Sequence, residues 1–443
     1  MPNILLFLAD DMTWRDCSVY GNPDVSTPNI QRMADEGITF HNMFTGTAMC
    51  APTRQQIFTG LFPVRSGAYP NHSMVYDGVR SIAYYFKEKG YEVALIGKQH
   101  YGPKASFPFT YLGGRGSDDG KGMDIALDHL DSIFESDRPF VVIVAQNQPH
   151  LPWNRGDSSL YNPNTLDIPD YMVDTEFTRT ELTKYYAEIT YMDDLLGECL
   201  DKIKSSGKEN NTISIFTSEQ GSTHPFAKWT CYDLGLKTGF IAKWPGKIER
   251  GNTTSAMCQY VDVVPTLLDL IGEDPDSIDT GICDGSGYRG FDGKSFKNVL
   301  LGKTEHHGEF VFGIHTTVGV KNGSPSYPIR SVRNNNYKYI KNLNHEVPFQ
   351  NNETELEGRH FGNWIQATKD STELYDWVRK YQFRPAEELY DIINDPWEKN
   401  NLANAHYLTQ EKAKLSKALD IWMKQQGDLG EKTELNATSR IHK

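Results

Sequence analysis

Residues 3–11 read Asn-Ile-Leu-Leu-Phe-Leu-Ala-Asp-Asp, so that a continuous apolar run leads directly into two adjacent acids. Three later stretches have the same form, an unbroken apolar run followed at once by a polar loop: Val93 to Ile96 before Gly97, Lys98, Gln99 and His100; Phe140 to Val144 before residues 146–150; and Ile213 to Phe216 before residues 217–220. Continuous rather than alternating hydrophobicity predicts strands covered on both faces, as in a parallel sheet flanked by helices.

The segments around these runs carry helical patterns, at Pro28 to Glu36, Val79 to Lys89, Met123 to Glu135 and Glu181 to Lys204. Alternating strands and helices predict an α/β fold with a large, mostly parallel sheet sandwiched by helices. From about residue 306 the character changes to strands of a meander at Glu309 to Ile314, Ile329 to Val332 and Tyr337 to Leu343, with a helix at Gln410 to Gln426. We therefore expect an α/β domain over residues 1–305 and a smaller C-terminal α+β subdomain with an antiparallel sheet over residues 306–443.

The polar loops after the strands are the candidate site. In open α/β sheets, ligands bind beyond the carboxyl ends of the strands. This rule predicts one pocket that gathers Asp10, Asp11, Lys98, His100, His150, Glu219 and Gln220.

The charge and hydropathy of the chain exclude two classes of protein. The 443 residues include 45 basic and 58 acidic side chains, a net charge of −13 that is spread along the sequence. A nucleic-acid binder would instead carry a basic patch. No apolar run approaches the roughly 20 residues of a membrane helix. We expect no nucleic acid and no membrane span, and a soluble monomer or homodimer.

Six scattered cysteines, Cys17, Cys50, Cys199, Cys231, Cys258 and Cys283, include no Cys-x-x-Cys pair. Zinc held by cysteines is therefore not expected. The scattered cysteines allow at most one or two disulfides. The apolar start lacks a cationic flank and is too short for a signal peptide, although a leader could have been removed from the chain. A periplasmic, secreted or lysosome-like location is the expectation.

The segment from Met49 to Gly60 reads Met-Cys-Ala-Pro-Thr-Arg-Gln-Gln-Ile-Phe-Thr-Gly. Pro52 suits the first turn of a helix, and Arg54 follows Cys50 by four residues, so both side chains can share one face of that helix. The amino end of a helix favours an anion because its free N–H groups point outward there. Cys50 is thus expected where an oxyanion would be held.

This segment resembles the sulfatase signature, Cys-x-Pro-Ser/Thr-Arg with a later Thr-Gly, at Cys50, Pro52, Thr53, Arg54, Thr59 and Gly60. The resemblance to this family within the alkaline phosphatase superfamily extends over essentially the whole chain. Within the family, the stretches at Gly97–Gly102, Ser326–Val332, Asn342–Phe349 and Glu388–Ala403 are most similar to heparan N-sulfatase (sulfamidase).

The resemblance implies a role for each candidate residue. A formylglycine-generating enzyme would convert Cys50 to formylglycine (3-oxoalanine), whose hydrate is the nucleophile. Calcium would be held by Asp10, Asp11, the modified Cys50, Glu219 and Gln220. Arg54 would stabilise the hydrate, and Lys98, His100 and Lys228 would hold the sulfate oxygens and the hydroxyls. His150 would protonate the leaving group, and His72 and Arg330 would line the substrate pocket.

Glu219 and Gln220 depart from the pattern of the family, which usually has Asp followed by Asn or His at these positions. Each side chain is one methylene longer, so the loop must retreat by about that length if both are to reach one metal ion. Loss of the metal site is the alternative.

The implied reaction begins with sulfate bound by calcium, Lys98 and Lys228. One hydroxyl of the hydrate attacks sulfur while His150 protonates the leaving atom, and a covalent sulfo-enzyme forms. His100 then helps to remove a proton from the other hydroxyl, so that the aldehyde re-forms and expels sulfate. The expected substrate is a sulfated sugar or oligosaccharide from a sulfated polysaccharide or glycosaminoglycan, attacked at an N-sulfate or an O-sulfate, with exo action favoured.

Two other functions remain open from the sequence. A phosphomonoesterase or phosphodiesterase of the same superfamily would share the fold but use Thr, Ser or unmodified Cys as nucleophile. A catalytically inactive carbohydrate-binding relative is suggested only by Glu219 and Gln220.

Overall fold

The computed structural model describes residues 1–113 and 125–441. Within these residues, nine strands form one sheet in the order β4-β3-β5-β1-β6-β7-β2-β8, with β9 paired to β2. Its bounds are β1 Asn3–Ala9, β2 Ile38–Phe44, β3 Glu92–Gly97, β4 Thr110–Tyr111, β5 Phe140–Ala145, β6 Thr212–Ser218, β7 Lys237–Lys243, β8 Asn252–Thr254 and β9 Cys258–Gln259. Strand β7 alone among these nine runs antiparallel to both of its neighbours, β6 and β2. The prediction of a mostly parallel sheet is confirmed.

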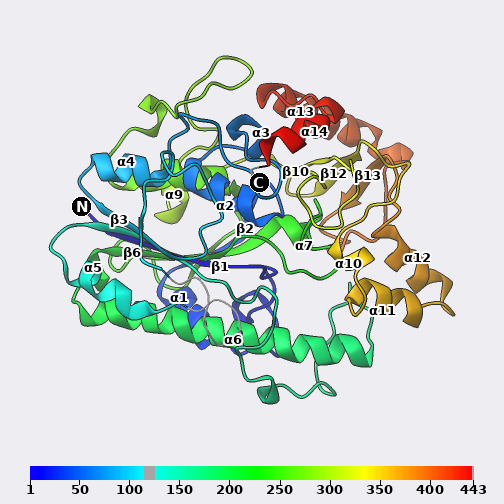
Figure 1. Ribbon diagram of the computed structural model, residues 1–443, viewed down its shortest axis with the longest axis horizontal. Helices are drawn as coiled ribbons and strands as arrows, with labels where there is room; N and C mark the ends of the chain where they lie inside the picture. Colours follow the sequence, from blue (N-terminus) through cyan, green and yellow to red (C-terminus); the bar gives the residue numbers. More distant parts are fainter. Residues whose placement is uncertain (114–124, 442–443) are drawn as a thin grey trace.

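Helices cover both faces of this sheet (Figure 1). Along β1, Leu5 and Phe7 pack on the face covered by α1 (Pro28–Glu36), α5 (Asp131–Glu135) and α6 (Glu176–Ser205). Ile4, Leu6 and Leu8 pack on the other face, under α2 (Cys50–Thr59), α4 (Ile82–Glu88), α8 (Val263–Leu270) and α9 (Lys297–Leu300). Every residue of β1 is buried, because both faces are covered, and this is why the run is continuously apolar.

The four predicted apolar runs are β1, β3, β5 and β6, and they end in register. Leu8 pairs with Ala145, Ala9 with Ser218, and Gly97 with Ala145. The loops that begin at residues 10, 98, 146 and 219 therefore leave the sheet along a single edge.

The helix predictions need small revisions. Helix α6 is longer than the predicted segment and starts after Thr175, whose side chain accepts a hydrogen bond from the Thr178 N–H. Of the helix predicted over Met123 to Glu135, residues 123 and 124 lie outside the described residues, and the remainder contains a 3-10 turn at Leu127–Leu130 followed by α5.

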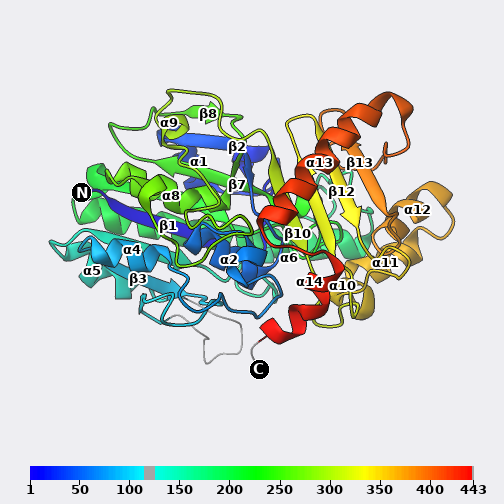
Figure 2. The same cartoon turned by 90° about the horizontal axis from the view of Figure 1, so that it is seen from above.

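A separate four-stranded antiparallel sheet lies within the segment that follows residue 305 (Figure 2). It consists of β10 (Val311–His315), β11 (Ile329–Arg333), β12 (Tyr337–Asn342) and β13 (Glu387–Asp391) in chain order. Helix α13 (Thr409–Gln425) crosses it and packs Leu415 and Leu419 against Val332. Strand β13 is not part of the predicted meander. In the sequence it is separated from β12 by three helices, α10 (Asn352–Glu355), α11 (His360–Ala367) and α12 (Thr372–Lys380). The division of the chain at residue 305 stays a prediction.

Three short helices complete the chain: α3 (Pro63–Ser66), α7 (Asp233–Leu236) and α14 (Glu431–Asn436). All six cysteines are free thiols, which agrees with the expected limit of at most one or two disulfides. Over residues 1–113 and 125–441, no helix combines the length and apolar character needed to cross a membrane.

Candidate active site

Cys50 is the first residue of α2 and lies 4% exposed at its amino end. The preceding residue, Met49, is extended and offers no side-chain cap, so the first N–H groups of the helix are left for another acceptor. All ten residues of α2 are buried, and the helix ends at Gly60, whose φ of 70° is readily adopted only by glycine. Burial, reinforced by the nearby Glu219 carboxyl, raises the pKa of the Cys50 thiol to about 12.

Two carboxylates face the sulfur of Cys50. Sγ lies 3.8 Å from Oδ1 of Asp10 and 4.0 Å from Oδ1 of Asp11. Both aspartates follow β1 and are fully buried, and Asp11 has a left-handed backbone with φ of 63°. Burial alone would raise the pKa of Asp10, but the ammonium group of Lys98 and other neighbours hold that pKa well below its usual value.

Each of these aspartates is paired with a lysine. Lys98, which follows β3, donates from Nζ to Oδ2 of Asp10. Lys228 Nζ lies 2.6 Å from Oδ2 of Asp11. Burial would lower the pKa of Lys228, but the Asp11 carboxylate outweighs it and raises that pKa. Both lysines are therefore charged in the folded protein, and their ammonium groups lie at the site.

Arg54 pairs with the third acid of the site. Its Nε lies 2.6 Å from Oε2 of Glu219, and both side chains are closed to solvent. The same guanidinium donates from Nη1 to the backbone carbonyl of Lys98 at 3.1 Å. Burial raises the pKa of Glu219 to about 8, with Arg54 opposing the rise. One arginine thus ties α2 to the loops after β3 and β6.

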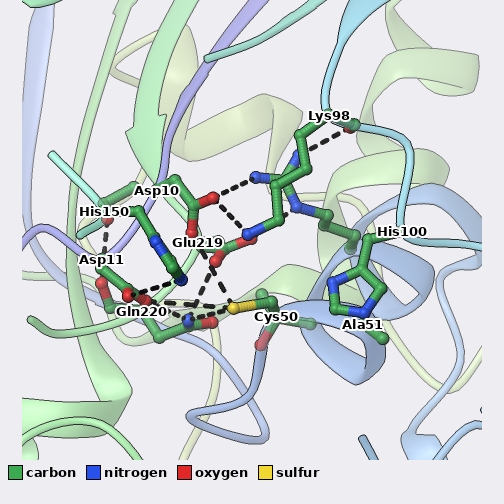
Figure 3. A network of polar contacts seen from close by, with 12 residues as sticks. Asp10, Asp11, Cys50, Ala51, Lys98, His100, His150, Glu219 and Gln220 are labelled. Carbon is green, nitrogen blue, oxygen red and sulfur yellow. Dashed lines mark hydrogen bonds and ion pairs between the residues drawn. The ribbon is translucent and has the colours of Figure 1, made fainter. Parts of the chain in front are cut away.

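Gln220 bridges the acids and the sulfur. Its Nε2 donates to Oδ1 of Asp11 at 2.8 Å, to Oε1 of Glu219 at 2.9 Å and to Sγ of Cys50 at 3.3 Å. Its Oε1 is buried and has no hydrogen-bond partner. Figure 3 shows these side chains converging from separate loops around Cys50.

The donor set fits a hard cation. One ligand atom each from Asp10, Asp11, Cys50 and Glu219 lies within 4.8 Å of the others. The unpartnered Oε1 of Gln220 adds a further oxygen beside them. Calcium takes six to eight oxygen ligands from carboxylates and amide carbonyls, so these residues match its chemistry despite the longer side chains at positions 219 and 220.

Two histidines border this cluster. His150 Nε2 lies 3.5 Å from Oδ2 of Asp11, while its Nδ1 donates to the Leu151 carbonyl at 2.6 Å. Burial lowers the pKa of His150, and Asp11 opposes that effect. His100 lies on the other side of Cys50, and its Nε2 is 3.0 Å from Nδ1 of His72.

Arg330 lies away from this cluster. It is 0% exposed, and its guanidinium forms a two-pronged ion pair with Asp428, one contact of which, Nη2 to Oδ1, measures 3.1 Å. Its Nη1 also donates to the backbone carbonyls of His315 and Ile329, so each nitrogen of the guanidinium has a partner inside the C-terminal part. The prediction that Arg330 lines the substrate pocket stays a prediction, whereas the contacts that the structure shows join β11 to the segment after α13.

Sequence reasoning missed a group of rings next to His150. Trp153 lies 5.6 Å from the ring of His224, which lies 4.6 Å from the ring of His360. Glu353 of α10 is also buried nearby, as it accepts a hydrogen bond from Thr223. These residues are far apart in the sequence and share no motif, so no pattern signalled their contact.

Comparisons with known proteins agree on one family. The family model described as Sulfatase matches residues 2–273. An ulvan-active sulfatase of Formosa agariphila is 33% identical over 437 residues, covering 97% of this chain and 81% of the relative. Human N-sulphoglucosamine sulphohydrolase is 28% identical over 457 residues, covering 95% of this chain and 89% of the relative. The putative sulfatase yidJ from Bacteroides fragilis has the same fold, with a TM-score of 0.75 at 18% identity over 100% of this chain and 98% of that one.

Proposed function

This chain belongs to the sulfatase family, and we propose that it hydrolyses a sulfate ester or sulfamate on a sulfated carbohydrate at the site around Cys50. One observation carries the proposal. The cysteine of the signature lies at the uncapped amino end of a buried helix, within 4.0 Å of two carboxylates that are themselves paired with two lysines.

The thiol of Cys50 is a poor nucleophile as it stands. A thiolate, not a thiol, attacks, and a pKa raised to about 12 leaves this group protonated at neutral pH. This favours the conversion of Cys50 to formylglycine over a mechanism that uses the unmodified thiol. The hydrated aldehyde supplies a hydroxyl nucleophile in this family. Because Cys50 is 4% exposed, we expect the formylglycine-generating enzyme to act on the chain before it folds.

Lys98 and Lys228 are the proposed sulfate-binding residues. Their ammonium groups flank the site from two different loops and are held there by Asp10 and Asp11. Fixed positive charge around the sulfuryl oxygens stabilises the charge that develops there during transfer. Arg54 holds the helix start and the Lys98 backbone, and so keeps this arrangement rigid.

His150 is the proposed acid for the leaving group. Its Nδ1–H is committed to the Leu151 carbonyl, so Nε2 is the ring nitrogen that faces the site. The Asp11 carboxylate, 3.5 Å from Nε2, favours the doubly protonated ring against the effect of burial, and the proton on Nε2 can then pass to a departing alcohol or amine. His100, on the opposite side of Cys50, is proposed to hold the hydroxyls of residue 50 and to take a proton from one of them.

Calcium is the proposed metal, with Asp10, Asp11, Glu219, Gln220 and the converted Cys50 as ligands. When bound, such an ion offsets the charge of the carboxylates and draws charge from the sulfate oxygens. The protein provides the ligands in a site closed to bulk solvent.

A sulfated sugar is supported by the names of the relatives, which include an ulvan-active sulfatase and an N-sulphoglucosamine sulphohydrolase. The net charge of −13 disfavours the binding of long polyanions to the surface outside the pocket. The same distant acids do not oppose a single sulfate inside the pocket, because salt screens their charge over about 8 to 10 Å. We therefore propose exo action on short or terminal sugars.

The test is a screen of defined N-sulfated and O-sulfated saccharides, with release of free sulfate as the readout and Cys50→Ala as the control. The proposal predicts sulfate release by the natural chain and none by the variant. A parallel set of phosphate esters tests the phosphatase alternative. Faster turnover of a phosphate ester, or activity that survives Cys50→Ala, would contradict the proposal.

A further inference from the structure

His72 and His100 form a hydrogen-bonded pair of imidazoles beside Cys50. Their ring centroids are 4.9 Å apart, and Nε2 of His100 lies 3.0 Å from Nδ1 of His72. His100 follows β3 and faces the site, whereas His72 lies in the loop after α3 and is exposed. The pair therefore reaches from the site to solvent.

Both histidines hold a backbone conformation that is rare for residues other than glycine. Their φ angles are 60° for His72 and 50° for His100. Such conformations cost free energy and persist where the surrounding structure enforces them. The loop of Gly319 presses on this region so closely that a Cβ at Gly319 would lie 2.4 Å from the Asn71 carbonyl oxygen. The Gly319 loop thus packs against the backbone that leads into His72.

The contact leaves one nitrogen of His100 for the site. Because Nε2 is used by His72, Nδ1 is the remaining ring nitrogen, and it is buried without a hydrogen-bond partner. In Figure 3 it lies on the edge of the ring that faces Cys50. An atom bound at residue 50 or on a sulfate would therefore meet Nδ1.

The neighbour of His72 fixes where the protons lie. A ring nitrogen that accepts a hydrogen bond carries no proton, so an imidazole with one accepting nitrogen is neutral and has its N–H on the other nitrogen. The amide Nδ2 of Asn71 lies 3.2 Å from Nε2 of His72 and can only donate. Nε2 of His72 is then an acceptor, its Nδ1–H donates to Nε2 of His100, and the proton of His100 is left on Nδ1.

We propose that His72 is a positioning residue for His100: it orients the ring with Nδ1 toward residue 50 and, with Asn71, makes the Nδ1–H form of His100 its resting state. His100 then enters the reaction as a hydrogen-bond donor to an oxygen at residue 50 or on the sulfate. Nδ1 of His100 can take a proton only in the other tautomer, in which Nε2 of His100 donates to Nδ1 of His72 and Nε2 of His72 donates to the Asn71 carbonyl. To reach that form, His72 passes its Nδ1 proton to Nε2 of His100, water removes the proton from Nδ1 of His100, and water returns one to Nε2 of the exposed His72. This inference rests on the proposed function for its meaning in catalysis, but not for its geometry.

The test is long-range ¹H–¹⁵N correlation spectroscopy of the purified, ¹⁵N-histidine-labelled protein, which reports which ring nitrogen of each histidine carries the proton. We expect His100 protonated on Nδ1. Asn71→Asp replaces the donor by a carboxylate that can only accept, so it should move the proton of His100 to Nε2. His72→Asn keeps the left-handed backbone, which Asn tolerates, and should remove the preference. Protonation of His100 on Nε2 in the natural protein, or a pattern unchanged in both variants, would overturn the proposal.

Kinetics separate positioning from a merely structural role. In His72→Asn we expect kcat to fall by about 10- to 100-fold, the range seen when groups that orient a site residue are removed, with KM little changed. His306→Asn, an exposed histidine elsewhere, is the matched control and should change neither the spectrum of His100 nor kcat. A raised KM at constant kcat would instead make His72 a substrate contact and overturn the proposal. If no sulfated sugar is turned over, the proposed function fails while the spectroscopic result stands by itself.

Discussion

Lys228 and Asp11 form a buried ion pair, with 2.6 Å between Nζ and Oδ2, although 217 residues separate them in the chain. Asp11 follows the first strand of the large sheet, and Lys228 lies in the loop that leaves β6, the strand next to it. The pair brings a fixed positive charge to the carboxylates that face Cys50.

We predict that Lys228→Met lowers kcat by about 10²- to 10³-fold, the effect of removing one preorganised group that stabilises transition-state charge. Steady-state sulfate release measures it. Lys243→Met is the matched control. Lys243 is also buried, but it pairs with Glu36 and, at 2.7 Å, with Glu209, and it is not one of the site residues. An equal loss of kcat in the two variants would mean that Lys228 acts only through stability.

We predict that calcium raises the melting temperature of the protein and that a chelator lowers it. Binding to the folded state alone adds about 2.7 kcal/mol to the free energy of unfolding when calcium is at 100 times its Kd. Thermal unfolding with calcium and with chelator measures this effect. Melting that is indifferent to both would remove Asp10, Asp11 and Glu219 as metal ligands.

Gln220 offers a sharper version of that test. Its buried Oε1 has no partner, so it is the atom available to a cation. Gln220→Met keeps the length of the side chain without the oxygen, and we expect it to reduce the calcium-induced rise in melting temperature. An unchanged rise in this variant would show that the longer side chain does not reach the metal.

The convergence of the site could be predicted because parallel strands impose it. Asp10, Lys98 and Glu219 each follow a continuous apolar run, and strands of one direction end at one edge. The assignment of Lys228 to the site rests on the family resemblance instead, because Lys228 does not directly follow an apolar run. The close contact of Arg54 with Glu219 was not predictable from either, because it depends on how far one extra methylene extends.

The contact between Arg330 and Asp428 could not be predicted from the sequence. Asp428 is 98 residues later, beyond α13, and no periodicity or spacing links the two. From the sequence, an arginine in a stretch shared with a relative is expected at the substrate. In the structure its position on β11 directs it into the interior instead.

We predict that Arg330→Met lowers the free energy of unfolding by about 3–5 kcal/mol, because it leaves Asp428 as an unpaired buried charge. Urea denaturation measures it. Arg289→Met removes a comparable but exposed pair with Asp279, and should leave the free energy of unfolding almost unchanged. A stable Arg330→Met protein with a raised KM would restore Arg330 as a substrate contact.

Glu353 should make stability depend on pH. Burial raises its pKa from 4.5 to about 7, with Arg359 opposing the rise. Between these two values the folded protein keeps a proton that the unfolded chain has lost, so the free energy of unfolding falls as pH rises and is lowest above pH 7.

Glu353→Gln removes this dependence. On going from about pH 5 to pH 8 we expect the variant to lose about 3 kcal/mol less stability than the natural protein. Urea denaturation at the two pH values measures the difference, and Glu355→Gln, exposed on the same helix, is the control. The same loss of stability in the natural protein and in Glu353→Gln would contradict the prediction.

The proposed reaction depends above all on the conversion of Cys50, at the start of α2, to a formylglycine nucleophile. Mass spectrometry of the peptide that contains Cys50, from protein made together with a formylglycine-generating enzyme, tests it most directly. We expect a mass about 18 Da below that of the unmodified peptide, as conversion of a thiol to an aldehyde requires. An unmodified thiol in protein that still releases sulfate would contradict it.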